Sequence, residues 1–156
     1  METISSYMAK DHDRLDELFK QFQNFKKQDI VKAKQFFHDF KIGLQRHIVW
    51  EEEILFPVFE TATGMTETGP TAVMRMEHRE IKGFLEKIYE HVSKASPDSD
   101  EFETGMLNVL KPHNDKEESM LYQWIDDAVD DNKRKSMFEE MHNLPEEKYK
   151  HCCENH

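Results

Sequence analysis

The chain has 156 residues, 37% of them hydrophobic and 34% charged, which fits one small helical domain with an apolar stripe on each helix. Five glycines and five prolines supply little turn chemistry for a β-sandwich, and the scarcity of β-branched runs argues against a sheet. A net charge of −11 argues against a general nucleic-acid binder and against docking on an anionic membrane, since both need clustered Lys and Arg.

The cellular compartment is predicted from the lack of a membrane span and of a signal peptide in the sequence. No segment approaches the length of a membrane span, and the first residues are polar and acidic rather than a signal-peptide core. We therefore expect a cytoplasmic protein. Two adjacent cysteines, Cys152 and Cys153, lie near the C-terminus, where we expect a reduced tail rather than a disulfide, a redox centre or a metal site.

Apolar residues recur at spacings of three and four along four long segments, which predicts four helices. In chain order these segments cover residues 5–27, 29–61, 70–95 and 100–130, and Asp29 is a plausible N-cap of the second. The predicted stripe of the fourth segment comprises Met106, Val109, His113, Glu117, Met120 and Trp124.

The connections between the segments are short. Residues 61–71 and 94–100 are rich in turn formers, and Gln28 marks the first break. Short connections imply antiparallel neighbours, so the sequence predicts an all-α, up-down-up-down four-helix bundle over residues 1–132. A short fifth helix near 133–143 and a tail make up the remaining residues, 133–156.

Two prolines interrupt the predicted helices. Pro57 and Pro112 each remove a backbone donor and are expected to kink or end the helix. At Pro112 we expect a kink that helps to aim His113. The alternative is that Pro112 begins a new helix, with residues 101–110 forming a separate element.

The sequence also contains an approximate internal repeat. The segment HIVWEEEILF, from His47, and the segment HNDKEESMLY, from His113, both read H-x-x-x-E-E-x-x-L-aromatic. The spacing from His12 to His47 equals that from His78 to His113, so the two halves superpose at an offset of 66 residues. Each half is a two-helix unit with one His and one HxxxE motif.

The repeat points to a metal centre. Residues four apart lie on the same helix face, so the two HxxxE motifs and the two further histidines converge inside a bundle. The candidate ligands are His12, His47, Glu51, His78, His113 and Glu117. Imidazole and carboxylate suit first-row metals, and the lack of cysteine disfavours a structural zinc or iron–sulfur site. Two carboxylates can each bridge a metal pair, so that each metal has two histidines and two carboxylate oxygens. An oxo or hydroxo bridge makes five donors, which leaves one position open on each metal for a small ligand.

The pattern H…HxxxE…H…HxxxE, with LFP after the first HxxxE, resembles the hemerythrin-like HHE cation-binding domain over about residues 5–130. The resemblance implies a centre of two non-haem iron ions. It places His12 and His47 on one iron, and His78 and His113 on the other. By the same resemblance Glu51 and Glu117 bridge the pair. Manganese stays an alternative because it accepts the same N/O ligands.

The sequence departs from the oxygen-carrying hemerythrins at one position. Those proteins have a further His one turn after the third ligand, where this chain has Lys82. We expect Lys82 to extend to solvent rather than to bind metal. The resulting four-His centre is similar to that of repair-of-iron-centres proteins and some bacterial hemerythrin-like proteins. The repair proteins usually carry a cysteine-containing domain before the bundle, whereas this sequence begins at the bundle.

Other residues near the motifs allow two readings. Gly43, one turn before His47, either leaves space beside the metals or marks a close helix contact. Glu52 and Glu118 are expected in solvent rather than as partners of the ligands, and Glu77 shares this ambiguity. Phe56 and Tyr122 correspond in the repeat and are expected in the core, with Tyr122 able to donate a hydrogen bond toward a bound ligand. The non-ligand histidines are His38, His91, His142, His151 and His156.

The candidate metal centre is compatible with two functions. The sequence assigns no catalytic residue for either of them. The first is reversible binding of a small ligand such as O2 or NO for storage, sensing or delivery. The second is an enzyme or repair factor that reduces peroxide or NO, or donates iron to damaged iron–sulfur clusters. The lack of a fifth His favours the enzyme or repair role. The lack of the cysteine-containing domain favours reversible binding of a small ligand. A metal-free helical interaction protein would leave six buried polar groups unexplained.

Overall fold

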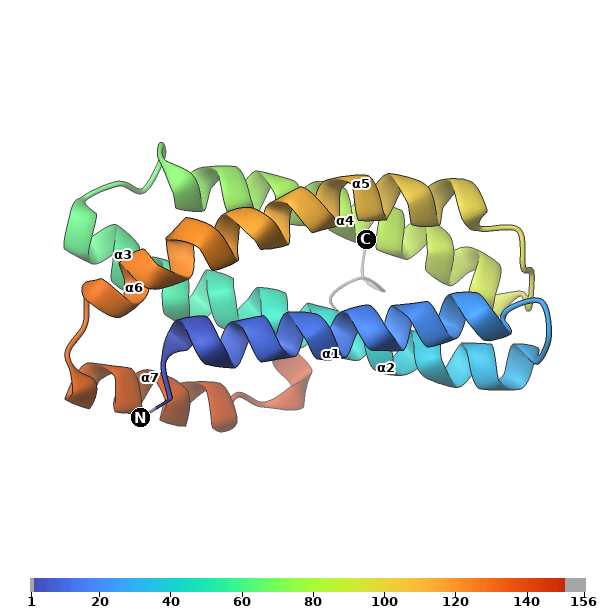
Figure 1. Ribbon diagram of the computed structural model, residues 1–156, viewed down its shortest axis with the longest axis horizontal. Coiled ribbons are helices and arrows are strands. Elements are labelled where there is room, and N and C mark those ends of the chain that lie inside the picture. The colour runs from blue at the N-terminus through green and yellow to red at the C-terminus, as the bar shows by residue number, and fades with distance from the viewer. Residues whose placement is uncertain (1, 151–156) are drawn as a thin grey trace.

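The computed structural model describes residues 2–150, and every regular element in that range is helical, which confirms the predicted all-helical class (Figure 1). Helix α1 (Ile4–Phe25) is followed by the antiparallel α2 (Ile30–Trp50), and α4 (Pro70–Ser93) by the antiparallel α5 (Asp100–Lys116). The contacts within each of these two hairpins are the most extensive between helices, and α2 also contacts α4. The two hairpins therefore lie side by side along the length of the molecule.

Two of the helical rods contain a π turn. Helix α2 continues through η1 (Glu51–Leu55) into α3 (Phe56–Thr63), and α5 continues through η2 (Glu117–Leu121) into α6 (Tyr122–Asp127). In each turn the backbone N–H bonds five residues back, from Phe56 to Glu51 and from Tyr122 to Glu117. Both π turns therefore begin at the glutamate of an HxxxE motif.

The structure shows how the helices begin and end and where the two prolines lie. The side chain of Asp29 accepts a hydrogen bond from the N–H of Lys32 and caps α2, as predicted. Pro57, whose nitrogen has no N–H to donate, lies in the first turn of α3 directly after the π turn. Helix α5 runs through Pro112, so the alternative of a new helix beginning there is wrong. Gly64, with a φ of 75°, ends α3 in the left-handed conformation that favours glycine.

Beyond each π turn the buried face shifts by one residue, because the turn holds one residue more than an α-turn. The predicted stripe is therefore wrong after Glu117. Met120 and Trp124 are 45% and 44% exposed, whereas Leu121 and Ile125 are buried. Tyr122 is also buried and completes the shifted face.

The core consists of two apolar clusters. One fills the end near the α1–α2 and α4–α5 turns and includes Phe19, Phe40 and Leu85. The other fills the opposite end and includes Met8, Phe56 and Ile125. Along each rod, the six candidate ligands lie between the residues of these two clusters, so they form a polar layer inside the bundle.

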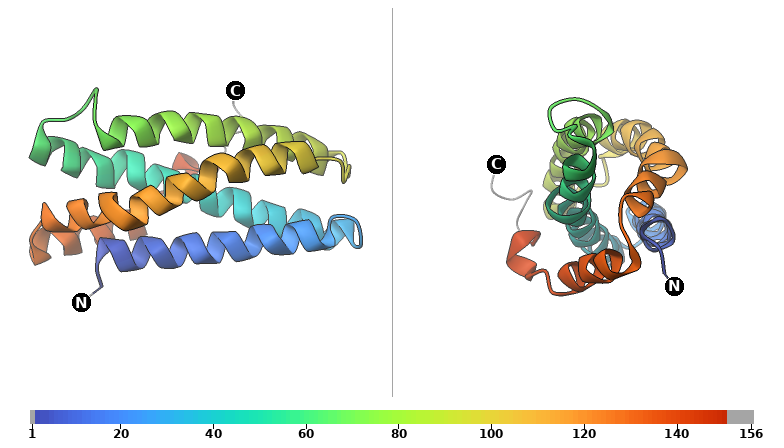
Figure 2. Two further views of the ribbon diagram at one scale, coloured as in Figure 1. Left: turned by 45° about the horizontal axis from the view of Figure 1, so that its top comes forward. Right: turned by 90° about the vertical axis from the view of Figure 1, so that its left-hand side faces the viewer.

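A further helix, α7 (Asp131–His142), confirms the predicted fifth helix. It packs beside η1, and its Phe138 contacts Tyr7 of α1 (Figure 2). The Trp50 indole N–H donates to the Met141 carbonyl at 3.1 Å. In the region expected to be a tail, Tyr149, after the 3₁₀ turn η3 (Glu146–Lys148), is buried, whereas residues 145–148 are exposed. The Gln45 amide donates to the Tyr149 carbonyl. Cys152, Cys153, His151 and His156 lie outside the described residues.

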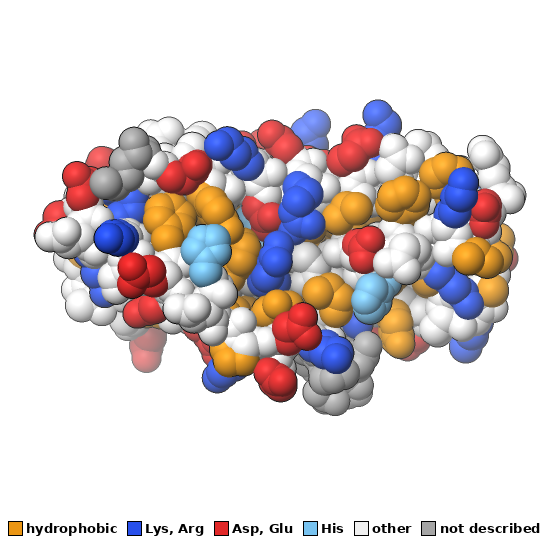
Figure 3. Space-filling view, turned by 90° about the horizontal axis from the view of Figure 1, so that it is seen from below, with side chains coloured by type: hydrophobic (Ala, Val, Ile, Leu, Met, Phe, Trp, Pro, Cys, Tyr) orange, Lys and Arg blue, Asp and Glu red, His pale blue; other side chains and the backbone are white. Residues whose placement is uncertain are grey.

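One face of the molecule is mixed in charge. Seen from below, acidic and basic side chains alternate with hydrophobic ones (Figure 3). Within residues 2–150, none of the helices is both long enough and apolar enough to traverse a lipid bilayer.

Candidate metal centre

All six predicted site residues come together in the polar layer. Each is at most 3% exposed, and they are contributed by α1, α2, η1, α4, α5 and η2. They are His12, His47, Glu51, His78, His113 and Glu117. Burying six ionisable groups is costly unless they are paired or bind a cation, so the layer needs a charge-balancing partner.

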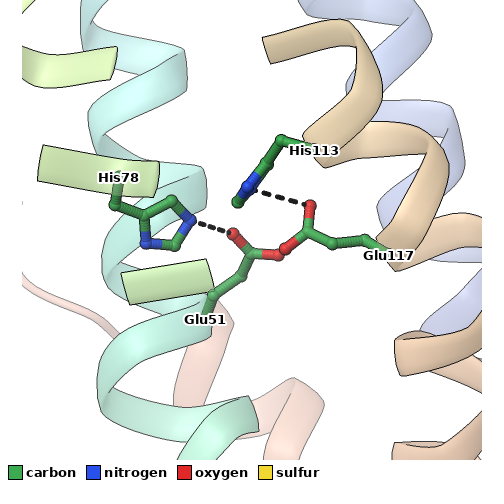
Figure 4. Close-up of side chains that lie close together, drawn as sticks. All are labelled: Glu51, His78, His113 and Glu117. Carbon is green, nitrogen blue, oxygen red and sulfur yellow. Dashed lines mark hydrogen bonds and ion pairs between the residues drawn. The ribbon is translucent and has the colours of Figure 1, made fainter. Parts of the chain in front are cut away.

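Nitrogen and oxygen atoms point toward one another in this layer. His78 Nε2 lies 3.0 Å from Glu51 Oε1, and His113 Nε2 lies 3.3 Å from Glu117 Oε1 (Figure 4). On the other side, His12 Nε2 lies 3.3 Å from the same oxygen of Glu117. The imidazole of His47 is farther away, with Nε2 at 3.7 Å from Glu51 Oε2.

The donor atoms fall into two groups. Glu51, His78, His113 and Glu117 form one, and His12, His47 and Glu117 form the other, with the atoms of each group within 4.8 Å of one another. The structure therefore brings together the two histidine pairs inferred from the sequence, and Glu117 is shared by both. That these residues are metal ligands stays a prediction.

The outward nitrogen of each of the four histidines contacts a carboxylate. In two of these contacts, one in each hairpin, the histidine and the carboxylate belong to the same hairpin. His47 Nδ1 lies 2.8 Å from Asp11 Oδ2, and His113 Nδ1 lies 2.9 Å from Glu77 Oε1. Glu77 is thus a partner of a candidate ligand. Asp11 was missed by the sequence reasoning, although its place before His12 matches that of Glu77 before His78 in the repeat.

The other two contacts join the hairpins. His78 Nδ1 lies 2.6 Å from Glu52 Oε2, and His12 Nδ1 lies 2.8 Å from Glu118 Oε2. The expectation that Glu52 and Glu118 are only solvated is wrong. Their side chains are 27% and 39% exposed, because each lies at the flank of its helix, where the adjacent helix brings an imidazole within reach.

These carboxylates orient the imidazoles. A carboxylate accepts the Nδ1 proton, so Nε2 is the nitrogen directed into the layer, and its lone pair becomes available to a metal when Nε2 loses its proton, as in metal-binding histidines. Four inward lone pairs and two buried carboxylates form a set of nitrogen and oxygen donors that suits first-row metals.

Charge in the layer perturbs the titration of its members. Burial and the neighbouring Glu117 raise the pKa of Glu51. Burial lowers the pKa of His12, but its hydrogen bond to Glu117 and the two nearby glutamates raise it overall to about 9. The same balance, through Glu51 and Glu52, raises the pKa of His78 to about 9. Without a metal, protons therefore supply the positive charge that the layer needs.

One oxygen remains without a partner. Glu117 Oε2 is buried and accepts no hydrogen bond from any of residues 2–150. A buried carboxylate oxygen in this state costs free energy, and a cation in the layer would satisfy it. The residues present therefore fit a metal.

An aromatic side chain from each half of the repeat borders the layer. Phe56 and Tyr122 are both fully buried, as expected. The Phe56 ring stacks on His78 at 5.8 Å between centroids. The hydroxyl of Tyr122 donates to Glu51 Oε2 at 2.7 Å, within the layer itself.

The remaining residues near the motifs can also be placed. Lys82 is half-buried, and its charge acts with the hydrogen bond from His78 to lower the pKa of Glu52 despite burial. A Cβ added at Gly43 would lie 2.7 Å from Leu15 Cδ2, so this glycine serves a close approach of α1 and α2. His38, His91 and His142 belong to neither donor group.

Comparisons with known proteins agree with this site. The model of the hemerythrin HHE cation-binding domain matches residues 3–125. The iron–sulfur cluster repair protein YtfE of Salmonella typhimurium is 43% identical over 51 residues, and that of Salmonella schwarzengrund is 41% identical over 51 residues. Each match covers 33% of this chain and 23% of the relative, so the chain matches less than a quarter of the relatives' length. No solved structure matches significantly.

Proposed function

The chain belongs to the hemerythrin HHE cation-binding family, and we propose that its polar layer holds two non-haem iron ions that bind or react with a small diatomic ligand, O2 or NO. The observation that carries the proposal is the set of four inward Nε2 atoms around two buried glutamates, one of which has an unpaired oxygen. In this proposal His12 and His47 hold one ion and His78 and His113 the other. Glu51 lies between His47 and His78, and Glu117 lies between His12 and His113, so these two carboxylates would be shared by the two ions.

The scaffold belongs to the same proposal. We propose that the rods 4–25, 30–63, 70–93 and 100–127 form an up-down-up-down four-helix bundle within residues 1–132. Residues 133–156 are then an addition to it. Each rod supplies at least one donor, so the packing of the rods fixes the spacing of the two ions.

The residues of the chain have distinct parts in this function. When bound, the iron ions supply the open coordination positions and the electrons that a diatomic ligand needs. Asp11, Glu52, Glu77 and Glu118 hold the four imidazoles in place through Nδ1. The two apolar clusters on either side exclude bulk water from the layer.

Metal content is the first test of the proposal. Protein reconstituted anaerobically with ferrous iron is expected to hold about two ions per chain by elemental analysis. His47→Ala should lose iron, whereas His38→Ala, at an exposed histidine of the same helix, should not. One ion per chain, or zinc bound with no uptake of iron, would contradict a two-iron centre.

Ligand chemistry is the second test. The reconstituted protein is exposed to O2, NO and peroxide while its absorption spectrum is recorded. A stable band that forms with O2 or NO and disappears when the gas is removed supports a binding role. Rapid oxidation without such a band contradicts a carrier and supports the alternative role.

That alternative is a repair factor or an enzyme, and the similarity to YtfE favours the repair form of it. The iron ions would then be delivered to damaged iron–sulfur clusters. The assay adds the iron-loaded protein to a purified iron–sulfur protein whose clusters have been damaged by peroxide. Recovery of the cluster spectrum with wild-type protein but not with His47→Ala supports repair.

A further inference from the structure

The hydroxyl of Tyr122 occupies the centre of one half of the polar layer. It lies 3.2 Å from Nε2 of His12 and 3.2 Å from Nε2 of His47. Its distances to Glu51 Oε2 and Glu117 Oε1 are 2.7 and 3.0 Å. One phenolic oxygen is therefore surrounded by the four atoms that we assign to the His12/His47 metal position.

These distances match those between ligands on one metal. When metal–nitrogen and metal–oxygen bonds are about 2.1 Å long, neighbouring ligand atoms at right angles lie about 3 Å apart. The Tyr122 oxygen keeps this separation from both imidazoles and both carboxylates. A cation among these atoms would meet the phenolic oxygen as a further donor without movement of the main chain.

In the other half of the layer, the residue that corresponds to Tyr122 has no hydroxyl. Phe56 takes the place of Tyr122 in the repeat, and both are the first residue after a π turn. Phe56 lies 5.8 Å from His78 and Tyr122 lies 5.7 Å from His12, measured between ring centroids. The two rings are therefore placed alike, but only the one at position 122 has a hydroxyl.

We propose that Tyr122 is a metal ligand, bound as a phenolate to the ion held by His12 and His47. This inference rests on the metal centre proposed above. A phenolate is a hard anionic oxygen donor of the kind that ferric iron accepts, and its proton passes to solvent when the metal binds. The His12/His47 ion thus has one protein ligand more than the His78/His113 ion, so a small external ligand binds at the second ion.

The test uses the spectrum of the iron-loaded protein after oxidation to the ferric state. A bound phenolate gives a visible charge-transfer band, and excitation in that band enhances phenolate ring modes in the resonance Raman spectrum. Wild-type protein is expected to show both signals. Tyr122→Phe, which removes one oxygen atom, should lose both signals while keeping both iron ions by elemental analysis.

Tyr7→Phe is the matched control. It makes the same chemical change at a tyrosine that packs against Trp50 and Phe138 instead of the polar layer, and it should keep both signals. Phe56→Tyr places a hydroxyl in the other half of the layer, and it should increase the intensity of the band.

The outcomes separate this inference from the proposed function. Wild-type protein that binds two iron ions without a charge-transfer band overturns the inference alone, with Tyr122 then a hydrogen-bond donor to the glutamates. A Tyr122→Phe protein that keeps the band overturns it as well. Protein that takes up no iron overturns the metal centre and this ligand with it. If Tyr122→Phe does not fold, the Raman spectrum of the wild-type protein decides.

Discussion

The carboxylate of Asp11 lies 2.8 Å from Nδ1 of His47, on the adjacent helix of the same hairpin, and both side chains are buried. Burial alone would raise the pKa of Asp11, but the hydrogen bond and charge of His47, with the charge of Arg14, lower it to about 2. Asp11 is therefore ionised at neutral pH and holds the imidazole with its Nε2 turned into the polar layer.

Asp11→Asn is expected to weaken iron binding about 10- to 100-fold, because an amide keeps the shape of the carboxylate but loses the charge that makes the imidazole a better donor. Competition with a chelator of known affinity measures the change. Asp13→Asn, at an exposed position on the same helix, is the control. Equal affinities for the two variants would show that Asp11 does not act through His47.

Iron loading should release protons. The pKa of His12 and of His78 is about 9 in the metal-free protein, so both are protonated at pH 7 and must lose a proton to bind iron through Nε2. Titration calorimetry in buffers of different ionisation enthalpy counts these protons. We expect about two from these histidines at pH 7, and fewer as the pH rises through 9. Loading at pH 7 without proton release would contradict the assigned charge states.

The unfolding free energies of two variants test which residues face the core after the second π turn. Leu121→Ala removes a buried side chain and should lower the free energy of unfolding of the metal-free protein by about 2–5 kcal/mol. Met120→Ala, at the neighbouring exposed position, should change it by no more than about 0.5 kcal/mol. Urea denaturation measures both. The opposite order would mean that the helix keeps α-helical register beyond Glu117.

A buried ion pair fastens the end of the bundle away from α7. Lys26 Nζ donates to Glu103 Oε2 at 2.5 Å, and Ser99 Oγ donates to the same oxygen at 2.5 Å. Glu103→Ala should destabilise the protein by about 1–3 kcal/mol, because it removes the buried carboxylate that Lys26 and Ser99 share, while Lys26 keeps its ion pair with Asp100. Thermal unfolding checks this, with the exposed Glu101→Ala as control. Similar melting temperatures for both variants would rule out a stabilising role for the pair.

Lys82→Met should leave the iron content unchanged, because the ammonium acts on Glu52 and belongs to the exterior of the layer. Elemental analysis after reconstitution measures this, and His78→Ala, one turn earlier, provides the comparison that loses iron. Loss of iron from Lys82→Met would make Lys82 a ligand and refute the assignment of four histidines and two glutamates.

The sequence was sufficient to place all six candidate ligands in one layer. The spacing of four in each HxxxE motif holds on any helix, and the repeat showed that His12 and His78 belong to the same set. The helices and their short connections followed from the apolar period, from the N-cap Asp29 and from the turn formers of residues 61–71 and 94–100. These features are local, so a single sequence contains them.

What the sequence did not show depends on the π turns and on contacts between helices. A π turn has no sequence signature as simple as a cap, so Met120 and Trp124 were placed on the buried face. Glu52 and Glu118 looked solvated because their partners, His78 and His12, belong to the other hairpin. The repeat contained the signal for Asp11, since its counterpart Glu77 also precedes a candidate ligand.

The contacts between the hairpins make the two halves of the site depend on each other. Glu52 of the first hairpin holds His78 of the second, and Glu118 of the second holds His12 of the first. One hairpin alone therefore carries only an unfinished site, and the donor set is assembled only when the two hairpins dock. Docking and assembly of the site are one event, so a change that loosens the contact between the hairpins also disorders the imidazoles.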